Sequence, residues 1–320
     1  STMSMNHGVV ENRGWELSIN YKPVRTRDLN IDLAFNLAKY ENVVKEVHEY
    51  ANLYGGAWDE NGSYLTRIIL NQPIGSFYGY KYDGVYLNEE QTIAKDKGGQ
   101  PIYTVDDQGN QVPVYMRFGY PTVDYTFKPG DARYKDLNND GNINYQDIAY
   151  LGDFNPLFYG GFTPCIKFRQ FSRNSGLHFR FGNDSSNMTR MKLEKMYNYD
   201  NQSKAVLKRW RHLYENVDEA PTDLLPRALY GEGYNWLASD RFVEDGSFLR
   251  WKSATFKYNF NKVWLSKHNI SELYLYLTVN NLHVWTNYTG QDPEVSLSSG
   301  KDNSRAPVTK SFTFGLNISF

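Results

Sequence analysis

The sequence contains no long run of apolar residues, although 40% of its 320 residues are hydrophobic. A transmembrane helix needs about 18 or more consecutive and mostly apolar residues, so that class of membrane protein is excluded. The lone cysteine, Cys165, excludes an internal disulfide framework, and the six scattered histidines show no zinc-ligand spacing. A net charge of −1 gives no support for binding to nucleic acid.

Catalytic motifs are also lacking. No nucleophile elbow and no phosphate-binding glycine loop occurs, and the paired acids read as ordinary loop charges. We therefore do not expect an enzyme. The sequence opens in polar residues without a secretory signal, which leaves a mature or an incomplete chain as the expectation.

Aromatic residues, in contrast, are abundant: they make up 16% of the chain, and 26 of them are tyrosines. Such an excess is typical of the interfacial girdles of membrane barrels, and also of carbohydrate-binding surfaces. The low mean hydropathy, −0.64, does not separate these classes. In a transmembrane barrel, lipid-facing and lumen-facing residues alternate and polar loops are added, so the average stays low.

The last segment, residues 308–320, alternates strictly between apolar and polar residues. Successive side chains of a strand point to opposite faces, so one face of this strand would suit hydrocarbon and the other water. A terminal strand of this kind, closed by a carboxy-terminal phenylalanine, is typical of outer-membrane barrels, although a soluble sandwich can also end on an amphipathic strand. The apolar positions are Val308, Phe312, Phe314, Leu316, Ile318 and Phe320.

Six earlier segments repeat this pattern, which predicts an all-β, antiparallel fold of about seven strands. Turns are expected near residues 23–28 and 172–176, and a phase slip at Asn280 and Asn281 indicates a β-bulge. The predicted strands lie near residues 12–22, 28–40, 158–169, 176–183, 247–260, 272–288 and 308–320.

The connections between these segments alternate in length. Three are short, and the other three, residues 41–157, 183–246 and 289–307, are long. Bacterial outer-membrane barrels have short periplasmic turns and long extracellular loops, whereas a sandwich has no reason to separate its loops in this way. Seven strands, however, is an odd number, and two open edges in lipid would leave costly unpaired backbone groups. We therefore expect the carboxy-terminal part of a larger barrel, completed by a longer precursor or a companion chain.

An acidic loop in the first long connection has the oxygen-ligand spacing of a calcium-binding loop. It has the glycine at position 6 and a carboxylate at position 12, but that carboxylate is aspartate instead of glutamate and no entering helix is evident. Clusters of Asn, Asp and Gly also form ordinary turns, so a structural Ca²⁺ ion is one of two open interpretations. The predicted ligands are Asp136, Asn138, Asp140, Asn142, Asn144 and Asp147.

Two further features lie in the second half of the chain. Residues 202–215 are predicted to form a short amphipathic helix. Aromatic residues in the long connections could stack on sugar rings, although packing or an interfacial belt is the commoner reason for such residues. The candidates for contact with substrate or with the lumen are Tyr234, Trp236, Arg180 and His178, and Glu16 and Lys167 are expected on the same polar side of the sheet.

Several motifs, in this order along nearly the whole chain, resemble the carboxy-terminal third of SusC/RagA-type TonB-dependent outer-membrane transporters of Bacteroidetes. They are NRGWEL at 12–17, PIGSFYGYKYDG at 73–84, YKDLNNDGNI at 134–143, VEDGSFLR at 243–250, NNLHVWT at 280–286 and FTFGLNISF at 312–320.

The resemblance implies a barrel of about 22 strands with an amino-terminal plug, in the outer membrane of a Gram-negative bacterium. It also implies a SusD-like surface lipoprotein as a lid, contact with TonB through the plug, and import of oligosaccharides or sometimes peptides. The plug and the amino-terminal barrel strands have no counterpart in the 320 residues, so we do not expect this polypeptide to transport alone. The alternative is a secreted calcium-dependent carbohydrate-binding β-sandwich, or a dockerin-like adhesion module, although a dockerin carries two acidic loops and this chain has one.

Overall fold

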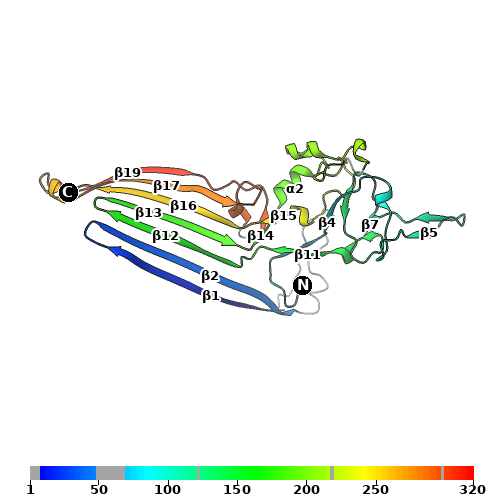
Figure 1. Cartoon of the computed structure of the whole chain (residues 1–320), viewed down its shortest axis with the longest axis horizontal. Coiled ribbons are helices and arrows are strands. Elements are labelled where there is room, and N and C mark those ends of the chain that lie inside the picture. Colours follow the sequence, from blue (N-terminus) through cyan, green and yellow to red (C-terminus); the bar gives the residue numbers. More distant parts are fainter. Residues whose placement is uncertain (1–7, 48–68, 121–122, 217–219, 297–298) are drawn as a thin grey trace, which may run out of the picture.

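The computed structural model describes residues 8–47, 69–120, 123–216, 220–296 and 299–320. Figure 1 shows a long sheet at one end of the molecule and a group of short strands and helices at the other. Within the described residues, no helix has the length and the apolar character that crossing a membrane requires.

The long sheet has seven strands, and their spatial order follows the order of the chain. Every neighbouring pair is antiparallel. Each strand overlaps one of the seven segments in which the sequence alternates. The strands are β1 (Gly8–Arg25), β2 (Leu29–Val47), β12 (Phe158–Phe168), β13 (Phe171–Phe181), β16 (Phe248–Asn259), β17 (Glu272–Thr286) and β19 (Ser311–Ser319).

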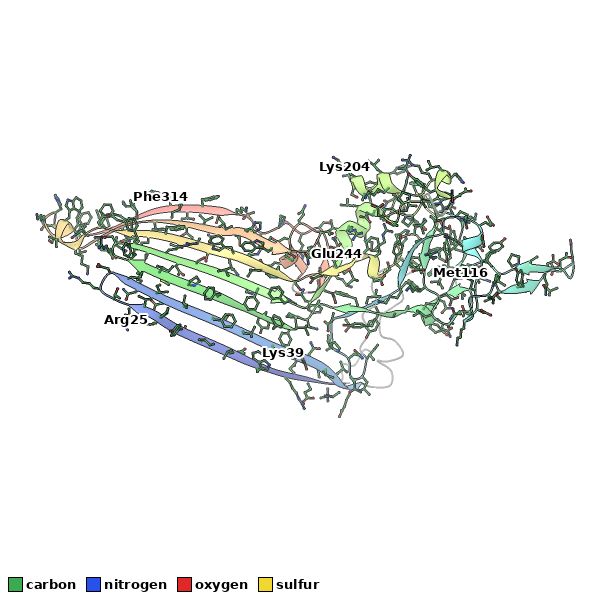
Figure 2. All side chains as sticks on the ribbon, viewed as in Figure 1. Arg25, Lys39, Met116, Lys204, Glu244 and Phe314 are labelled. Carbon is green, nitrogen blue, oxygen red and sulfur yellow. The ribbon has the colours of Figure 1, made fainter. Side chains whose placement is uncertain are left out.

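The register of these strands places most of the apolar side chains in rows on one side of the sheet. Phe314 pairs with Leu277, and Leu277 pairs with Phe256 on the next strand. Phe314 is 72% exposed, and Figure 2 shows it on the outermost strand. We call this side the apolar face. It includes Trp15, Leu17, Ile19, Phe35, Leu37, Ile166, Phe168, Phe179, Phe256, Leu277, Phe314 and Leu316.

The opposite side, which we call the polar face, carries the intervening residues of the same strands. Thr255 pairs with Thr278, and their hydroxyl oxygens lie 3.0 Å apart. Lys257 lies over the ring of Tyr274, with its Nζ atom 3.3 Å from the ring centroid. The polar face also includes Glu16, Ser18, Asn36, Lys167, His178, Arg180, Arg250, Tyr276 and Asn317.

The short connections of the long sheet lie at one end and the long ones at the other (Figure 1). The first turn occupies residues 26–28, because β1 continues past Pro23 through a bulge between Tyr21 and Val24. The prediction of a turn at residues 172–176 was wrong. These residues belong to β13, and the hairpin turns at Arg169 and Gln170, where Arg169 has a φ of 52°. The third short connection contains the helix α3 (Lys262–Ser266).

The bulge expected at Asn280 and Asn281 is present. The pairing of β16 with β17 shifts between Trp251 and Ser253, opposite these residues, and Asn281 has a φ of 52°. A strand with one extra residue must place that residue outside the ladder, which is why the alternation of the sequence slips there.

The three clusters of buried hydrophobic residues lie at the end of the molecule opposite the short turns, in a part built mainly from residues 69–157 and 183–246, which we call the outer region. Its largest cluster contains Tyr80, Tyr86, Phe118, Phe127 and Ile143. Its strands are β3 (Ser76–Gly79), β4 (Tyr82–Val85), β5 (Tyr103–Val105), β6 (Gln111–Pro113), β7 (Arg117–Tyr120), β8 (Val123–Thr126), β9 (Ala132–Tyr134), β10 (Asn142–Ile143), β11 (Ala149–Asp153), β14 (Asp184–Asn187), β15 (Val243–Asp245) and β18 (Lys301–Asp302).

Helical segments in this region are short. One is the α-helix α2 (Met188–Glu194), and the others are 3₁₀ turns. The 3₁₀ turns are η1 (Glu90–Thr92), η2 (Tyr145–Asp147), η3 (Lys204–Lys208), η4 (His212–Tyr214), η5 (Asp240–Phe242) and η6 (Pro293–Ser296).

The single amphipathic helix predicted at residues 202–215 was wrong. The segment forms η3 and η4, separated by an extended stretch around Trp210. That stretch pairs with Leu225, since the Trp210 amide donates to the Leu225 carbonyl and the Leu225 amide donates to Lys208. Backbone pairing with a distant segment competes here with the local helical hydrogen bonds, and Trp210 is still buried, as its apolar position suggested.

Candidate functional site

A groove of about 650 Å³ runs over the polar face where β1, β2, β12 and β13 meet. Its wall includes Glu16 and His178, two of the residues expected to face a lumen. Gly161 lies opposite Asn36 on one side and His178 on the other, so the absence of a side chain at this position deepens the groove. The groove is also lined by Ser18, Asn36, Ala38 and Tyr159.

His178 lies at the end of this groove, beside a buried charge cluster. Its cross-strand neighbour Arg250 is 3% exposed. The Arg250 Nη2 atom lies 2.5 Å from Asp292 Oδ1, and its Nε atom also contacts Glu294. The His178 Nδ1 atom is 3.9 Å from Glu294 Oε1. Two acids of a long loop are therefore held against the polar face by an arginine of the sheet.

Arg180 also joins the polar face to an outer segment. Its Nη2 atom donates to the backbone carbonyl of Phe154, just before β12. The guanidinium thus donates one hydrogen bond within the protein, and contact of Arg180 with a solute stays a prediction.

Tyr234 and Trp236, the two aromatic candidates, are packed into the outer region. The ring of Tyr234 lies 4.4 Å from that of Phe118, between centroids. Trp236 is 8% exposed, and its ring lies 5.2 Å from that of Tyr197. The structure therefore does not bring these two residues together with His178 and Arg180, and the burial of Trp236 leaves little of its ring open for stacking on a sugar.

The acidic loop at residues 136–147 closes on itself through hydrogen bonds. The Asp136 carboxylate accepts from the amides of Asn139 and Gly141, both at 2.7 Å. Asp147 accepts from the amides of Leu137 and Asn144. Asn144 caps η2 by accepting from the Gln146 amide, and Asn138 donates to Asp140 and to Gln146.

This geometry gives each carboxylate a partner without a cation. Across the described ranges, no three Asp, Glu, His or Cys side chains form a group suited to a metal ion. The oxygen atoms of a carboxylate still have lone pairs to spare after accepting one hydrogen bond each, so their chemistry is compatible with Ca²⁺. The calcium site, with Asn142 as a further ligand, stays a prediction.

Hydrogen bonds to Asp302 hold the last long loop against the outer region. The Tyr288 hydroxyl donates to Asp302 Oδ2 at 2.7 Å, and Thr189 Oγ1 lies 3.0 Å from Asp302 Oδ1. Burial and the neighbouring Asp302 carboxylate raise the pKa of the Tyr288 phenol, so the phenol stays protonated and remains a donor. Tyr288 is therefore a packing residue and not an exposed aromatic platform.

Sequence similarity identifies relatives of this chain. It is 28% identical over 334 residues to TonB-dependent receptor P3 of Formosa agariphila, an alignment that covers 100% of this chain and 30% of that receptor. It is 26% identical over 326 residues to TonB-dependent receptor SusC of Bacteroides thetaiotaomicron, covering 99% of this chain and 27% of that receptor. The chain is a homologue of TonB-dependent receptors. The resemblance inferred from its motifs is thereby confirmed.

Solved structures show the same fold. The RagAB peptide transporter matches with a TM-score of 0.69 at 20% identity, over 98% of this chain and 30% of that one. The RagAB peptide importer in its open-open state matches with a TM-score of 0.62. No family model matches the sequence. The chain thus spans about 30% of the length of the receptor and of the transporter that it matches. These relatives are receptors and transporters, not enzymes.

The cluster of Arg250, Asp292 and Glu294 was missed by the sequence analysis. The only signal was an arginine at a polar-face position of an alternating strand, opposite a loop that contains three acids. Because 42 residues separate Arg250 from Asp292, only the strand order brings them together.

Proposed function

We propose that this chain forms part of the wall and the outer loops of an outer-membrane, TonB-dependent nutrient importer of the SusC type. One observation carries the proposal: a single sheet presents an exposed apolar face and a polar face, with all its short turns at one end. The named relatives support the same role.

The apolar face is suited to contact with acyl chains. Phe312 and Phe314 are 71% and 72% exposed, and strands of transmembrane barrels carry such residues on alternate positions. A β-sandwich would cover these side chains with a second sheet. In the part of the chain that the structure describes, the other sheets have two or three strands and lie beyond the end of the long sheet (Figure 1), which argues against the secreted sandwich and the dockerin-like module.

Additional strands would complete the wall. Among the strands that the structure describes, β1 and β19 each pair with a single neighbour. Unpaired backbone groups cost several kcal/mol each in hydrocarbon, so these two edges would pair with the remaining strands of a closed barrel of about 22 strands. The short turns would then face the periplasm and the outer region would face the exterior.

The groove on the polar face would line the path of the solute. Its carboxylate, imidazole, amide and hydroxyl groups can hydrogen-bond to an oligosaccharide or a peptide. A plug, TonB and a SusD-like lipoprotein lid would supply gating and energy. Arg180 would contribute positive charge, and His178 a hydrogen-bonding imidazole, at the outer end of this path.

The decisive experiment measures uptake of a labelled oligosaccharide and a labelled peptide by cells that carry the full-length receptor, with and without TonB. TonB-dependent uptake of either solute is expected. Ala38→Trp would narrow the groove and lower uptake, whereas Phe35→Trp, which places the same ring on the apolar face of the same strand and outside the groove, would not. Equal uptake by both variants at equal surface levels would contradict the proposal.

A further inference from the structure

Arg173 is a cation within a row of the apolar face. It pairs with Ile166 of β12 on one side and with Phe256 of β16 on the other. Its guanidinium carbon lies 5.5 Å from the centroid of the Phe256 ring and 5.9 Å from that of Trp251. The side chain is exposed, and no acid within the described ranges forms an ion pair with it.

An unpaired arginine on a lipid-facing row is unfavourable near the middle of a bilayer and much less so near its surface. Arg173 is four positions from Arg169 in the hairpin turn, so it lies about 13 Å along the strand from that residue, and less along the tilted barrel axis. Trp264, Phe260 and Tyr258 form a chain of ring contacts at the same end of the sheet. Such an aromatic belt is typical of the depth at which lipid headgroups begin.

Arg173 also borders an apolar groove of about 430 Å³ on the same face. The groove crosses several strands and is lined mainly by hydrocarbon and aromatic side chains, together with Ser172 and Lys257, whose positions belong to the polar face. Its lining includes Ile166, Phe168, Phe171, Phe256, Leu277 and Phe314. A positive charge at the rim of an apolar groove matches a ligand with an anionic head and a hydrocarbon chain.

We propose that Arg173 and this groove bind one anionic phospholipid of the periplasmic leaflet. The guanidinium would hold the phosphate through two parallel hydrogen bonds, and an acyl chain would lie in the groove. The aromatic rings of Phe256 and Trp251 keep the guanidinium at the rim by cation–π contact and leave its donors available. The inference rests on the proposed function, because it requires the apolar face to meet a membrane.

The test uses the purified full-length receptor and native mass spectrometry, with phosphatidylglycerol and phosphatidylcholine as the two probes. The wild-type receptor should retain phosphatidylglycerol with about a fivefold preference, the effect of one basic residue near an anionic headgroup. Arg173→Gln should remove the preference, and Arg173→Lys should restore part of it. Arg13→Gln, in β1 and beside Glu11, is the matched control and should leave the preference unchanged.

A second measurement separates this inference from the proposed function. Brominated phosphatidylcholine in vesicles should quench the tryptophan fluorescence of the wild-type receptor and of Arg173→Gln equally, because both expose the apolar face to acyl chains. No quenching in either protein would overturn the proposed function. Normal quenching without a preference for phosphatidylglycerol would overturn the lipid site alone, as would a wild-type dimer that becomes monomeric in Arg173→Gln.

Discussion

The Nη2 atom of Arg250 lies 2.5 Å from the Oδ1 atom of Asp292, and both side chains are buried. The pair joins β16 of the long sheet to the loop that begins after β17. Asp292 also accepts from the amides of Glu294 and Val308, so one carboxylate organises both ends of this loop. The Arg250 guanidinium therefore holds this loop against the polar face of the long sheet.

Arg250→Leu should release this loop. Removing one partner of a buried ion pair costs about 3–5 kcal/mol, because the other charge is left buried without compensation. Hydrogen exchange at the Glu294 amide should therefore become faster, while the strands of the sheet stay protected. Arg305→Leu, an exposed arginine near the end of the same loop, is the control. Equal exchange at Glu294 in the two variants would show that the ion pair does not hold the loop.

A second buried acid should be equally important for the outer region. Asp131 is 0% exposed and accepts from Arg227, Tyr125 and the Lys128 amide. Asp131→Ala should destabilise this region by about 3–5 kcal/mol, because it leaves a partly buried guanidinium and a phenol without their acceptor. Hydrogen exchange at the Ala132 amide is the measurement.

The control for this prediction is Asp124→Ala. Asp124 pairs with Arg117 at 2.7 Å, but the Asp124 side chain is 65% exposed. Exposed ion pairs contribute about 0–1 kcal/mol, so this variant should change little. If the two variants lose the same stability, burial does not decide the contribution of these acids.

The sequence alone predicted the long sheet well, and the reason is physical. Phe314 and Leu316 follow the two-residue period of an amphipathic strand. This period can be counted in the sequence without knowing which strands pair with it. The hairpin turn at Arg169 was misplaced because Arg173 interrupts the apolar row and reads as part of a polar turn. A single arginine on the apolar face thus concealed the first part of a strand.

The outer region was less predictable. Trp210 and Trp236 are buried by contacts with segments far away in the sequence, so neither helical periodicity nor an exposed aromatic platform described them correctly. Likewise, nothing in the sequence near Arg250 indicates that its partner is Asp292. Short elements stabilised by long-range pairing carry no local period that could be counted.

For the acidic loop, calcium binding gives a measurable difference in protection. Asp136→Ala and Asp140→Ala should each abolish calcium-dependent protection of residues 130–150 from protease, because each removes a predicted oxygen ligand. Asp106→Ala is the control, since Asp106 closes a similar turn by accepting from the amides of Gln108 and Asn110 outside this loop. Identical digestion of the wild-type protein with calcium and with chelator would exclude the ion.

The orientation of the last strand is tested by charge on its two sides. Phe314 and Leu316 lie on the apolar face. Thr313, which precedes Phe314, lies on the polar face, where it pairs with Thr278. Phe314→Arg and Leu316→Arg should each lower assembly in the outer membrane, because an arginine on a lipid-facing row costs about 2–4 kcal/mol at the bilayer midplane and less towards its surface. Thr313→Arg should assemble, because its side chain would meet water.

Assembly is read from the heat-modifiable migration of the full-length receptor in gels. Normal assembly of the first two variants would contradict the contact of this face with lipid, and failure of Thr313→Arg alone would mean that the two faces are assigned the wrong way round.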